Sequence, residues 1–88
     1  MKKAIITVVG KDTVGIIAKV CVYLAENKVN ILDISQTIVD GYFNMMMVAD
    51  VSGVEFDRIS DGLKAVGEEI GVIIRCQRED IFDKMHRI

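Results

Sequence analysis

The sequence has few of the residues that would hold a metal, a disulfide framework or a cofactor. Its 88 residues include one histidine, His86, and two cysteines, Cys21 and Cys76, with no Cys-x-x-Cys pair. A structural zinc site takes about four such ligands, and small disulfide-stapled domains carry more cysteines at closer spacing. Both cysteines lie in apolar runs, where a free thiol packs as a small hydrophobic group. We therefore expect no metal, no disulfide and no cofactor.

Basic charge and long apolar runs are also scarce. The formal net charge is −2, without the basic excess of nucleic-acid-binding domains, so direct DNA contact is disfavoured. No stretch approaches the roughly 20 apolar residues that cross a bilayer. The apolar run after Lys3 is short, meets Lys11 and Asp12 and lacks a small-residue cleavage site, so it predicts a strand rather than a signal peptide. These features indicate a cytoplasmic protein without membrane contact.

The usual motifs of catalysis are missing as well. There is no Gly-x-Ser-x-Gly, and the segment 10–15 lacks the Gly-Lys-Ser/Thr ending of a phosphate-binding loop. A small hydrolase of the acylphosphatase type needs an arginine in that loop, which offers only Lys11. We expect that the protein is not an enzyme.

What is present is a globular composition, with 51% hydrophobic and 27% charged residues. We interpret residues 1–88 as a single domain whose residues 79–88 form a C-terminal extension. A core of this size is only marginally stabilising, and without disulfides or metal the remaining aid is self-association.

The hydrophobic pattern predicts the order β-α-β-β-α-β. The expected elements are strand Lys3–Val9, helix Val14–Asn27, strands Val29–Asp40 and Tyr42–Val51 joined by an Asp40-Gly41 hairpin, helix Phe56–Ile70 ended by Gly71, and strand Val72–Arg78. The predicted fold class is α+β: a ferredoxin-like sandwich of a four-stranded antiparallel sheet with two helices on one face.

Three segments carry more apolar surface than this fold buries. The first helix has two adjacent stripes, Ile17/Cys21/Leu24 and Ile16/Val20/Tyr23, which implies either a second subunit or tight packing within one chain. In the second strand Leu32, Ile34, Gln36 and Ile38 should share one face, and Ile31, Asp33, Ser35, Thr37 and Val39 the other. The methionines 45–47 must point to both faces, one into the core and the other onto an adaptable contact surface.

Two segments are candidates for binding. Residues Gly10–Gly15 join a strand to a helix, whose free N–H groups can hold a carboxylate or phosphate. The alternative is structural: Asp12 or Thr13 caps the helix, and the glycines only allow the turn. Asn30 offers amide donors and an acceptor to a ligand, or else satisfies the local backbone.

These two segments resemble ACT domains. The resemblance lies in Gly10, Lys11, Asp12, Thr13, Val14 and Gly15, which open the helix, and in Val29-Asn30-Ile31 followed by Gln36. It covers Lys3 to about Arg78 and is similar to small single-domain bacterial ACT proteins and to the ACT halves of the glycine cleavage system transcriptional repressor. Thr13-Val14 departs from the Arg-Pro that many members carry.

The resemblance implies a homodimer that binds an amino acid or similar small metabolite at its interface. It implies a ligand site formed by residues 10–15 with Asn30 and Ile31. A carboxylate would lie at the helix N-terminus, and Asp12 or the Asn30 carbonyl oxygen would receive an ammonium group. The domain would then act on a partner protein, either a regulated enzyme or a transcription regulator. The alternative is an interaction module that binds a partner through its methionine face without a small ligand.

Overall fold

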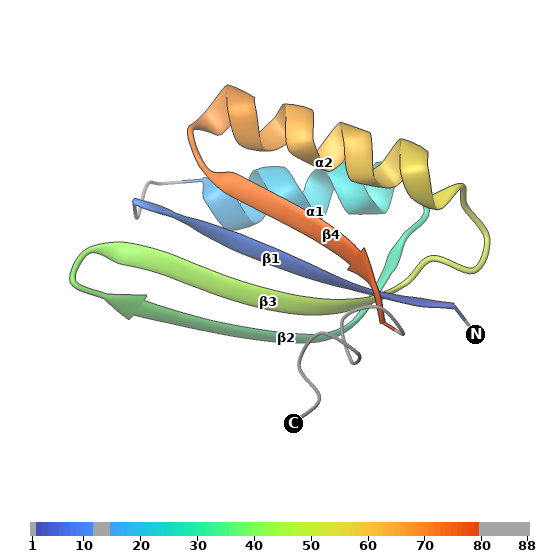
Figure 1. Ribbon diagram of the computed structural model, residues 1–88, viewed down its shortest axis with the longest axis horizontal. Coiled ribbons are helices and arrows are strands. Elements are labelled where there is room, and N and C mark those ends of the chain that lie inside the picture. Colours follow the sequence, from blue (N-terminus) through green and yellow to red (C-terminus); the bar gives the residue numbers. More distant parts are fainter. Residues whose placement is uncertain (1, 12–14, 80–88) are drawn as a thin grey trace.

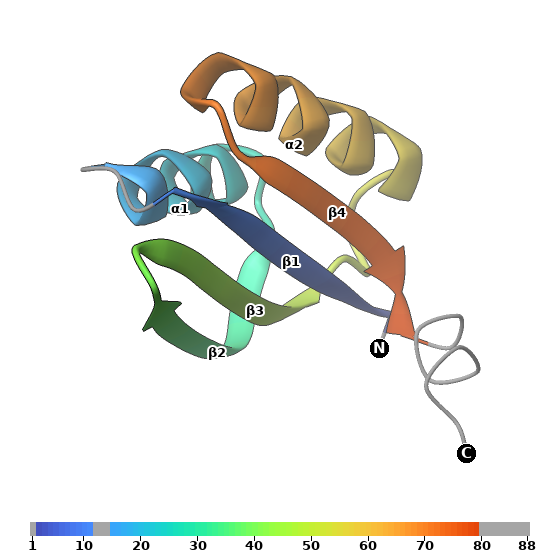
Figure 2. The same ribbon diagram turned by 60° about the vertical axis from the view of Figure 1, so that its left-hand side comes forward.

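The computed structural model describes residues 2–11 and 15–79, which follow the order β-α-β-β-α-β (Figure 1). The elements are β1 Lys3–Lys11, α1 Ile16–Glu26, β2 Asn30–Val39, β3 Tyr42–Asp50, α2 Phe56–Ile70 and β4 Ile73–Arg78. The strands form one antiparallel sheet in the order β2-β3-β1-β4. Both helices lie on the same side of this sheet (Figures 1 and 2). The predicted ferredoxin-like sandwich is confirmed.

The first strand is longer than the sequence predicts. Gly10 and Lys11 were expected in a loop, but they continue β1 opposite Phe43 and Tyr42 of β3. Because β3 provides backbone partners as far as Tyr42, the antiparallel pairing of β1 continues past Gly10. Helix α1 then begins after Gly15, whose φ of 93° lies in the left-handed region that glycine adopts without strain. The proposed capping residues Asp12 and Thr13, and Val14 beside them, lie outside the described residues.

The core lies between the sheet and the helices. Alternate residues of β1 and β3 point into it, because successive side chains of a strand face opposite ways. The largest side chains that are fully buried are Ile6, Val8, Val20, Leu24, Met47, Ile59 and Leu63. On α2 all six charged residues predicted for the outer face, Asp57, Arg58, Asp61, Lys64, Glu68 and Glu69, are exposed, which confirms its amphipathic pattern.

The connections behave as their residues predict. Asp40 and Gly41, at φ 54° and 77°, form the turn between β2 and β3, and two positive φ angles are the mark of a type I′ hairpin. Gly71 ends α2 in the left-handed conformation at φ 76°. Beyond it the N–H of Val72 donates to the carbonyl of Gly67 (2.9 Å), which brings the end of α2 down onto the start of β4.

A bulge in β2 changes which residues face the core. The register shifts between Ile31 and Asp33, so Leu32 is the extra residue. Ile31 pairs with the buried Ala49 and packs against the core, whereas the pattern placed it with Asp33 on the other face. Alternation predicts faces only along an unbroken ladder, and one inserted residue reverses every assignment before it.

Gly67 provides a test of how closely α2 approaches β4. A Cβ at this position would lie 2.7 Å from the carbonyl oxygen of Val72, a backbone atom that cannot rotate away. We expect Gly67→Ala to lower the free energy of unfolding by about 1–3 kcal/mol, although alanine is the better helix former by about 1 kcal/mol. Unfolding in urea measures the change in the free energy of unfolding. The control is Gly53→Ala, where the new Cβ meets nothing within 4 Å and the change should stay within about 0.5 kcal/mol. Equal stability of the two variants would contradict the close approach.

Candidate functional site

One candidate segment lies where β1 leads into α1. Lys11 is exposed at the end of β1, and Gly15 is exposed at the N-cap of α1. The helix receives no side-chain capping bond among the described residues and has no acidic residue in its first turn. The first intrahelical bond runs from the N–H of Lys19 to the carbonyl of Gly15 (2.9 Å), so the N–H groups of the first turn before Lys19 have no intrahelical partner. Together with the lysine ammonium they make this end of the helix attractive to an anion.

The other candidate, Asn30, begins β2 and is exposed. Its neighbour across the ladder is Asp50, whose carboxylate accepts hydrogen bonds from the N–H (2.9 Å) and the hydroxyl of Ser52. These bonds hold the pKa of Asp50 below its usual value. The carboxylate of Asp50 is thus engaged by its own turn, whereas the amide of Asn30 extends from an exposed strand.

Within one chain the two candidate segments are far apart. Asn30 and Lys3 both pair with Asp50, whereas Lys11 and Val39 both pair with Tyr42, so Asn30 and Lys11 lie at opposite ends of the sheet. Eight residue steps along a strand span about 26 Å. Figure 1 shows the same separation: α1 begins at the hairpin end of β2 and β3 and returns to the start of β2 at the far end. The structure therefore does not bring these residues together in a single chain.

The edge strand between these ends is unusually exposed. Apart from half-buried Ile31, every residue of β2 is exposed. On the helix side of the strand, Ile34 (44%) and Ile38 (61%) pair with buried Met47 and Phe43, yet no helix covers them. Ile17 on α1 is exposed as well. The excess apolar arc predicted for α1 is thus present. We call the three exposed isoleucines of α1 and β2, Ile17, Ile34 and Ile38, the β2/α1 edge.

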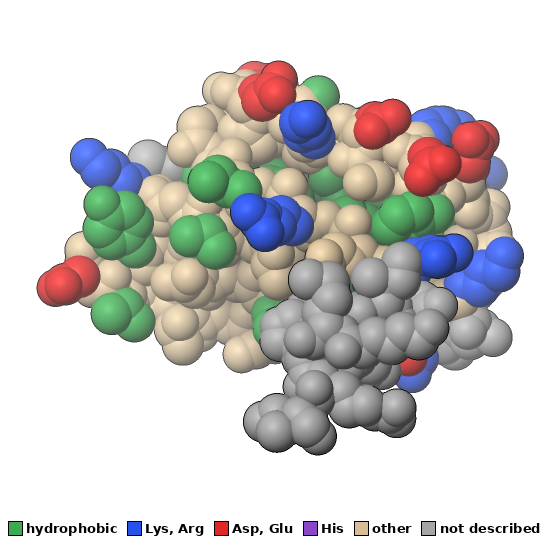
Figure 3. Space-filling model, in the orientation of Figure 1, with side chains coloured by type: hydrophobic (Ala, Val, Ile, Leu, Met, Phe, Trp, Pro, Cys, Tyr) green, Lys and Arg blue, Asp and Glu red, His purple; other side chains and the backbone are tan. Residues whose placement is uncertain are grey.

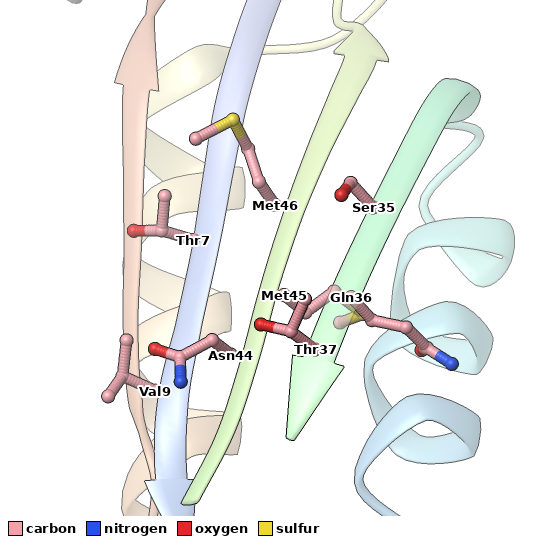
Figure 4. Close-up of a pocket in the computed structure, with 8 residues that line it drawn as sticks. All are labelled: Thr7, Val9, Ser35, Gln36, Thr37, Asn44, Met45 and Met46. Atoms are coloured by element: carbon pink, nitrogen blue, oxygen red, sulfur yellow. The ribbon is translucent and has the colours of Figure 1, made fainter. Parts of the chain in front are cut away.

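The sheet face opposite the helices, here called the open face, has a shallow hollow of ≈ 210 Å³ (Figure 4). Its lining contains no charged residue: Thr7, Val9, Ser35, Gln36, Thr37, Asn44, Met45 and Met46. In Figure 4 Gln36 turns away from the others toward α1. An amino acid carries a charged ammonium and carboxylate, for which this hollow offers no counter-charge. The sequence pattern does not predict this hollow, although the uncharged polar residues at alternate positions of β2 are its signal.

The methionines divide between the two faces as predicted. Met45 and Met47 are buried beneath the helices, whereas Met46 is 43% exposed on the open face. Figure 3 shows that charged side chains gather over α2 and are sparse on the visible face of the sheet, where hydrophobic side chains cluster at the hairpin end.

The other reactive side chains that the structure describes are two cysteines and a tyrosine. Cys21 and Cys76 are free thiols, and burial raises the pKa of Cys76 to about 11, so its nucleophilic thiolate is disfavoured. Tyr23 packs α1 against α2, and burial raises its pKa although the charge of Arg58 partly opposes this. Among residues 2–11 and 15–79 no three His, Cys, Asp or Glu side chains gather as metal ligands would. No described helix is both long and apolar enough to cross a membrane.

This architecture, a four-stranded antiparallel sheet with two helices on one side and an exposed edge strand, defines a small ferredoxin-like domain. The chain belongs to the ACT domain family, whose profile matches residues 2–77. ACT domains are regulatory rather than catalytic modules, so the family assigns a regulatory class to this chain.

Relatives and solved structures agree with the family. A UPF0237 protein of Bifidobacterium longum is 63% identical over the whole of both chains, and one of Listeria innocua is 52% identical over 98% of this chain and 99% of its own. Among solved structures, an ACT domain protein from Streptococcus pneumoniae shares 44% identity over 93% of this chain and 94% of its own, with a TM-score of 0.83. A protein described as a glycine cleavage system transcriptional repressor matches at 25% identity over 88% of this chain and 45% of its own, with a TM-score of 0.80.

The burial of Cys76 predicts its reactivity. With a pKa of about 11, only about one Cys76 in a thousand is a thiolate at pH 8. We expect iodoacetamide to modify Cys76 at least about 100-fold more slowly in the folded protein than in urea. Mass spectrometry of peptides follows the modification, and a Cys76→Ala variant assigns the signal of Cys21. Rapid modification of Cys76 in the folded protein would show that the thiol is activated and would reopen a catalytic interpretation.

Proposed function

We propose that this protein is a regulatory ACT domain that binds an amino acid or a similar small metabolite at the interface of a homodimer. The observation that carries the proposal is the position of the two candidate segments at opposite ends of a sheet. Its edge strand, β2, has no neighbouring strand on its outer side among the described residues and is exposed on both faces.

Antiparallel pairing of β2 with β2 of a second copy brings the candidate segments together. In such a pair Asn30 of one copy lies beside the Val39 end of the other, which is the end where Lys11, Gly15 and the start of α1 lie. Each dimer then has two equivalent sites, and each site takes its loop from one chain and its asparagine from the other. The symmetry is that of an isologous dimer.

The β2/α1 edge supports this mode of pairing. A ten-residue edge strand with exposed Ile34 and Ile38 is a template for another strand, which natural proteins normally cover or interrupt. The opposite edge, β4, has six residues and lies beneath α2. Strand addition at β2 would satisfy its outer backbone groups and remove Ile17, Ile34 and Ile38 from water.

The chemistry of the composite site suits an α-amino acid. The carboxylate would accept hydrogen bonds from the first turn of α1 near Lys11, and the ammonium would donate to Asp12 or to the carbonyl oxygen of Asn30 from the other chain. Thr13, Val14, Gly10 and Ile31 complete the proposed lining, and Gly15, where a Cβ would meet nothing within 4 Å, would admit the ligand close to the backbone. We further propose that the protein acts in the cytoplasm on an enzyme or a transcription regulator, as a single domain over residues 1–88.

One observation favours a second interpretation. The exposed Met46 lies beside an uncharged hollow on the open face, and flexible methionine surfaces suit protein partners. Under this interpretation the dimer binds a partner protein and no small ligand.

Complementation between variants tests the composite site. We expect Asp12→Ala and Asn30→Ala each to abolish the rise in melting temperature that the bound amino acid produces by mass action. Mixing the two purified variants should restore binding, because a mixed dimer has one site with both side chains intact. Statistical mixing gives about a quarter of the wild-type sites, which isothermal calorimetry counts.

The outcomes separate the alternatives. If the mixture binds no better than either variant alone, the site lies within one chain. If none of the twenty amino acids raises the melting temperature of the wild type, the interaction module becomes the better interpretation.

A charge on the β2/α1 edge tests the dimer. We expect Ile34→Asp to raise the dimer dissociation constant by about 30-fold or more, since truncating or charging a central interface residue costs about 2 kcal/mol or more. Analytical ultracentrifugation measures the dimer dissociation constant. The matched control is Ile73→Asp on β4, where the side chain is 63% exposed at the other edge, and there the constant should stay within a factor of about ten. Equal effects of the two substitutions would place the dimer contact elsewhere.

A further inference from the structure

The regular part of β2 lies between two irregularities. The bulge at Leu32 interrupts the ladder at one end, and the turn that begins at Asp40 stops it at the other. Between them residues 33–39 pair with β3 without interruption. A second strand can pair regularly with β2 only along this segment, because a bulge disrupts the alternation of hydrogen bonds. The midpoint of the segment is Gln36.

Alternate residues of the segment direct their backbone groups outward. The hydrogen bond of a two-residue hairpin turn joins the residues on either side of it, here Val39 and Tyr42. Val39 therefore points its backbone groups toward β3, and the direction alternates from residue to residue along an antiparallel ladder. The residues that point outward are Ile34, Gln36 and Ile38. The N–H of Ile34 agrees with this direction, because it donates to the carboxylate of Asp33 beside it (2.8 Å).

Twofold symmetry limits the registers in which two copies of β2 can pair. Facing residues of an antiparallel pair lie on the same side of the sheet, so the axis must pass between two equivalent residues. With the axis at Gln36, Ile34 of each copy faces Ile38 of the other. With the axis at Ser35 or Thr37, the side chain of Gln36 faces an isoleucine instead. Only the axis at Gln36 pairs the whole regular segment with its copy.

The side chains match one another in this register. Ile34 and Ile38, both exposed in a single chain, cover each other on the helix side of the sheet. At the axis the glutamine amide has both donors and an acceptor, so two identical amides can hydrogen-bond to each other. Asp33 is the one charged residue of the segment and faces Val39 of the other copy. Six residue steps, about 20 Å, then separate the two Asp33 carboxylates along the strands.

We propose that two copies of the protein pair residues 33–39 of β2 antiparallel about a twofold axis at Gln36. The amide of Gln36 meets its own copy there and selects this register, because moving the axis by one position sets the amide against an isoleucine. A single polar residue in an apolar contact can specify register and partner in this way. The inference rests on the homodimer of the proposed function, and it names the register of that dimer and the residue that selects the partner.

Cysteine substitution along β2 tests the register. Facing residues have Cα atoms about 5.5 Å apart, within the range of a disulfide, whereas diagonal neighbours are about 7–8 Å apart. With oxidised glutathione we expect Gln36→Cys to give at least about tenfold more disulfide-linked dimer than Ser35→Cys or Thr37→Cys. Mass spectrometry of peptides separates this link from any disulfide of Cys21 or Cys76.

Sedimentation of the reduced variants and of the wild type separates the register from the dimer. A link through Ser35→Cys or Thr37→Cys in place of Gln36→Cys overturns the register and leaves the homodimer intact. A dimer without a link at any of the three positions overturns the pairing through residues 33–39. A wild-type protein that sediments as a monomer overturns the homodimer of the proposed function.

Opposite charges at the axis give a second readout. Gln36→Glu faces its own copy, so like charges repel in its homodimer, and the same holds for Gln36→Lys. In an equimolar mixture we expect the mixed dimer to exceed about three quarters of all dimers, against about half for random pairing. Native mass spectrometry counts the species when one variant is isotope-labelled. The matched control is Val39→Glu with Val39→Lys, about 20 Å apart across the axis, which should pair at random. Equal fractions of mixed dimer for the two pairs would overturn the position of Gln36 at the axis.

Discussion

Two helices lie over a sheet of four strands, and they leave most of its β2 edge exposed. The core positions of β1, β3 and β4 lie between the sheet and the helices, whereas β2 has one half-buried residue among ten. Ile34 and Ile38 face the helix side of the sheet but remain 44% and 61% exposed in a single chain. The exposed apolar edge depends on this incomplete cover, and so do the proposed pairing of two chains and the proposed composite ligand site.

The sequence predicts most of the fold because the signals that carry it are local. The period of Ile59 and Leu63 on α2, the Asp40-Gly41 turn and the glycine that ends α2 each act over a few residues, and each appears as expected. The ladder that carries β1 through Gly10 depends instead on the backbone of β3, which is distant in sequence. The bulge at Leu32 is likewise a property of two paired strands, so alternation within β2 misplaced Ile31.

The candidate site could be predicted only as a set of residues. Composition and position suggest Asn30 and the glycine-flanked segment separately, and the resemblance to ACT domains joins them. Their placement at opposite ends of the sheet follows from the register of β2, β3 and β1, which no local pattern contains. A ligand site that contains both segments, as we propose, therefore takes them from two different chains. The uncharged hollow around Thr7 and Asn44 was missed because its lining comes from three strands.

The separation of about 26 Å along the sheet between Asn30 and Lys11 has a consequence for how such a protein would respond in a cell. A site that needs both chains does not exist in the monomer, so ligand binding and dimer formation are thermodynamically linked. Ligand would then draw monomers together, and the apparent affinity for ligand would fall when the protein is diluted below its dimer dissociation constant. The amount of the protein, and not only the concentration of the metabolite, would thus set the threshold of the signal.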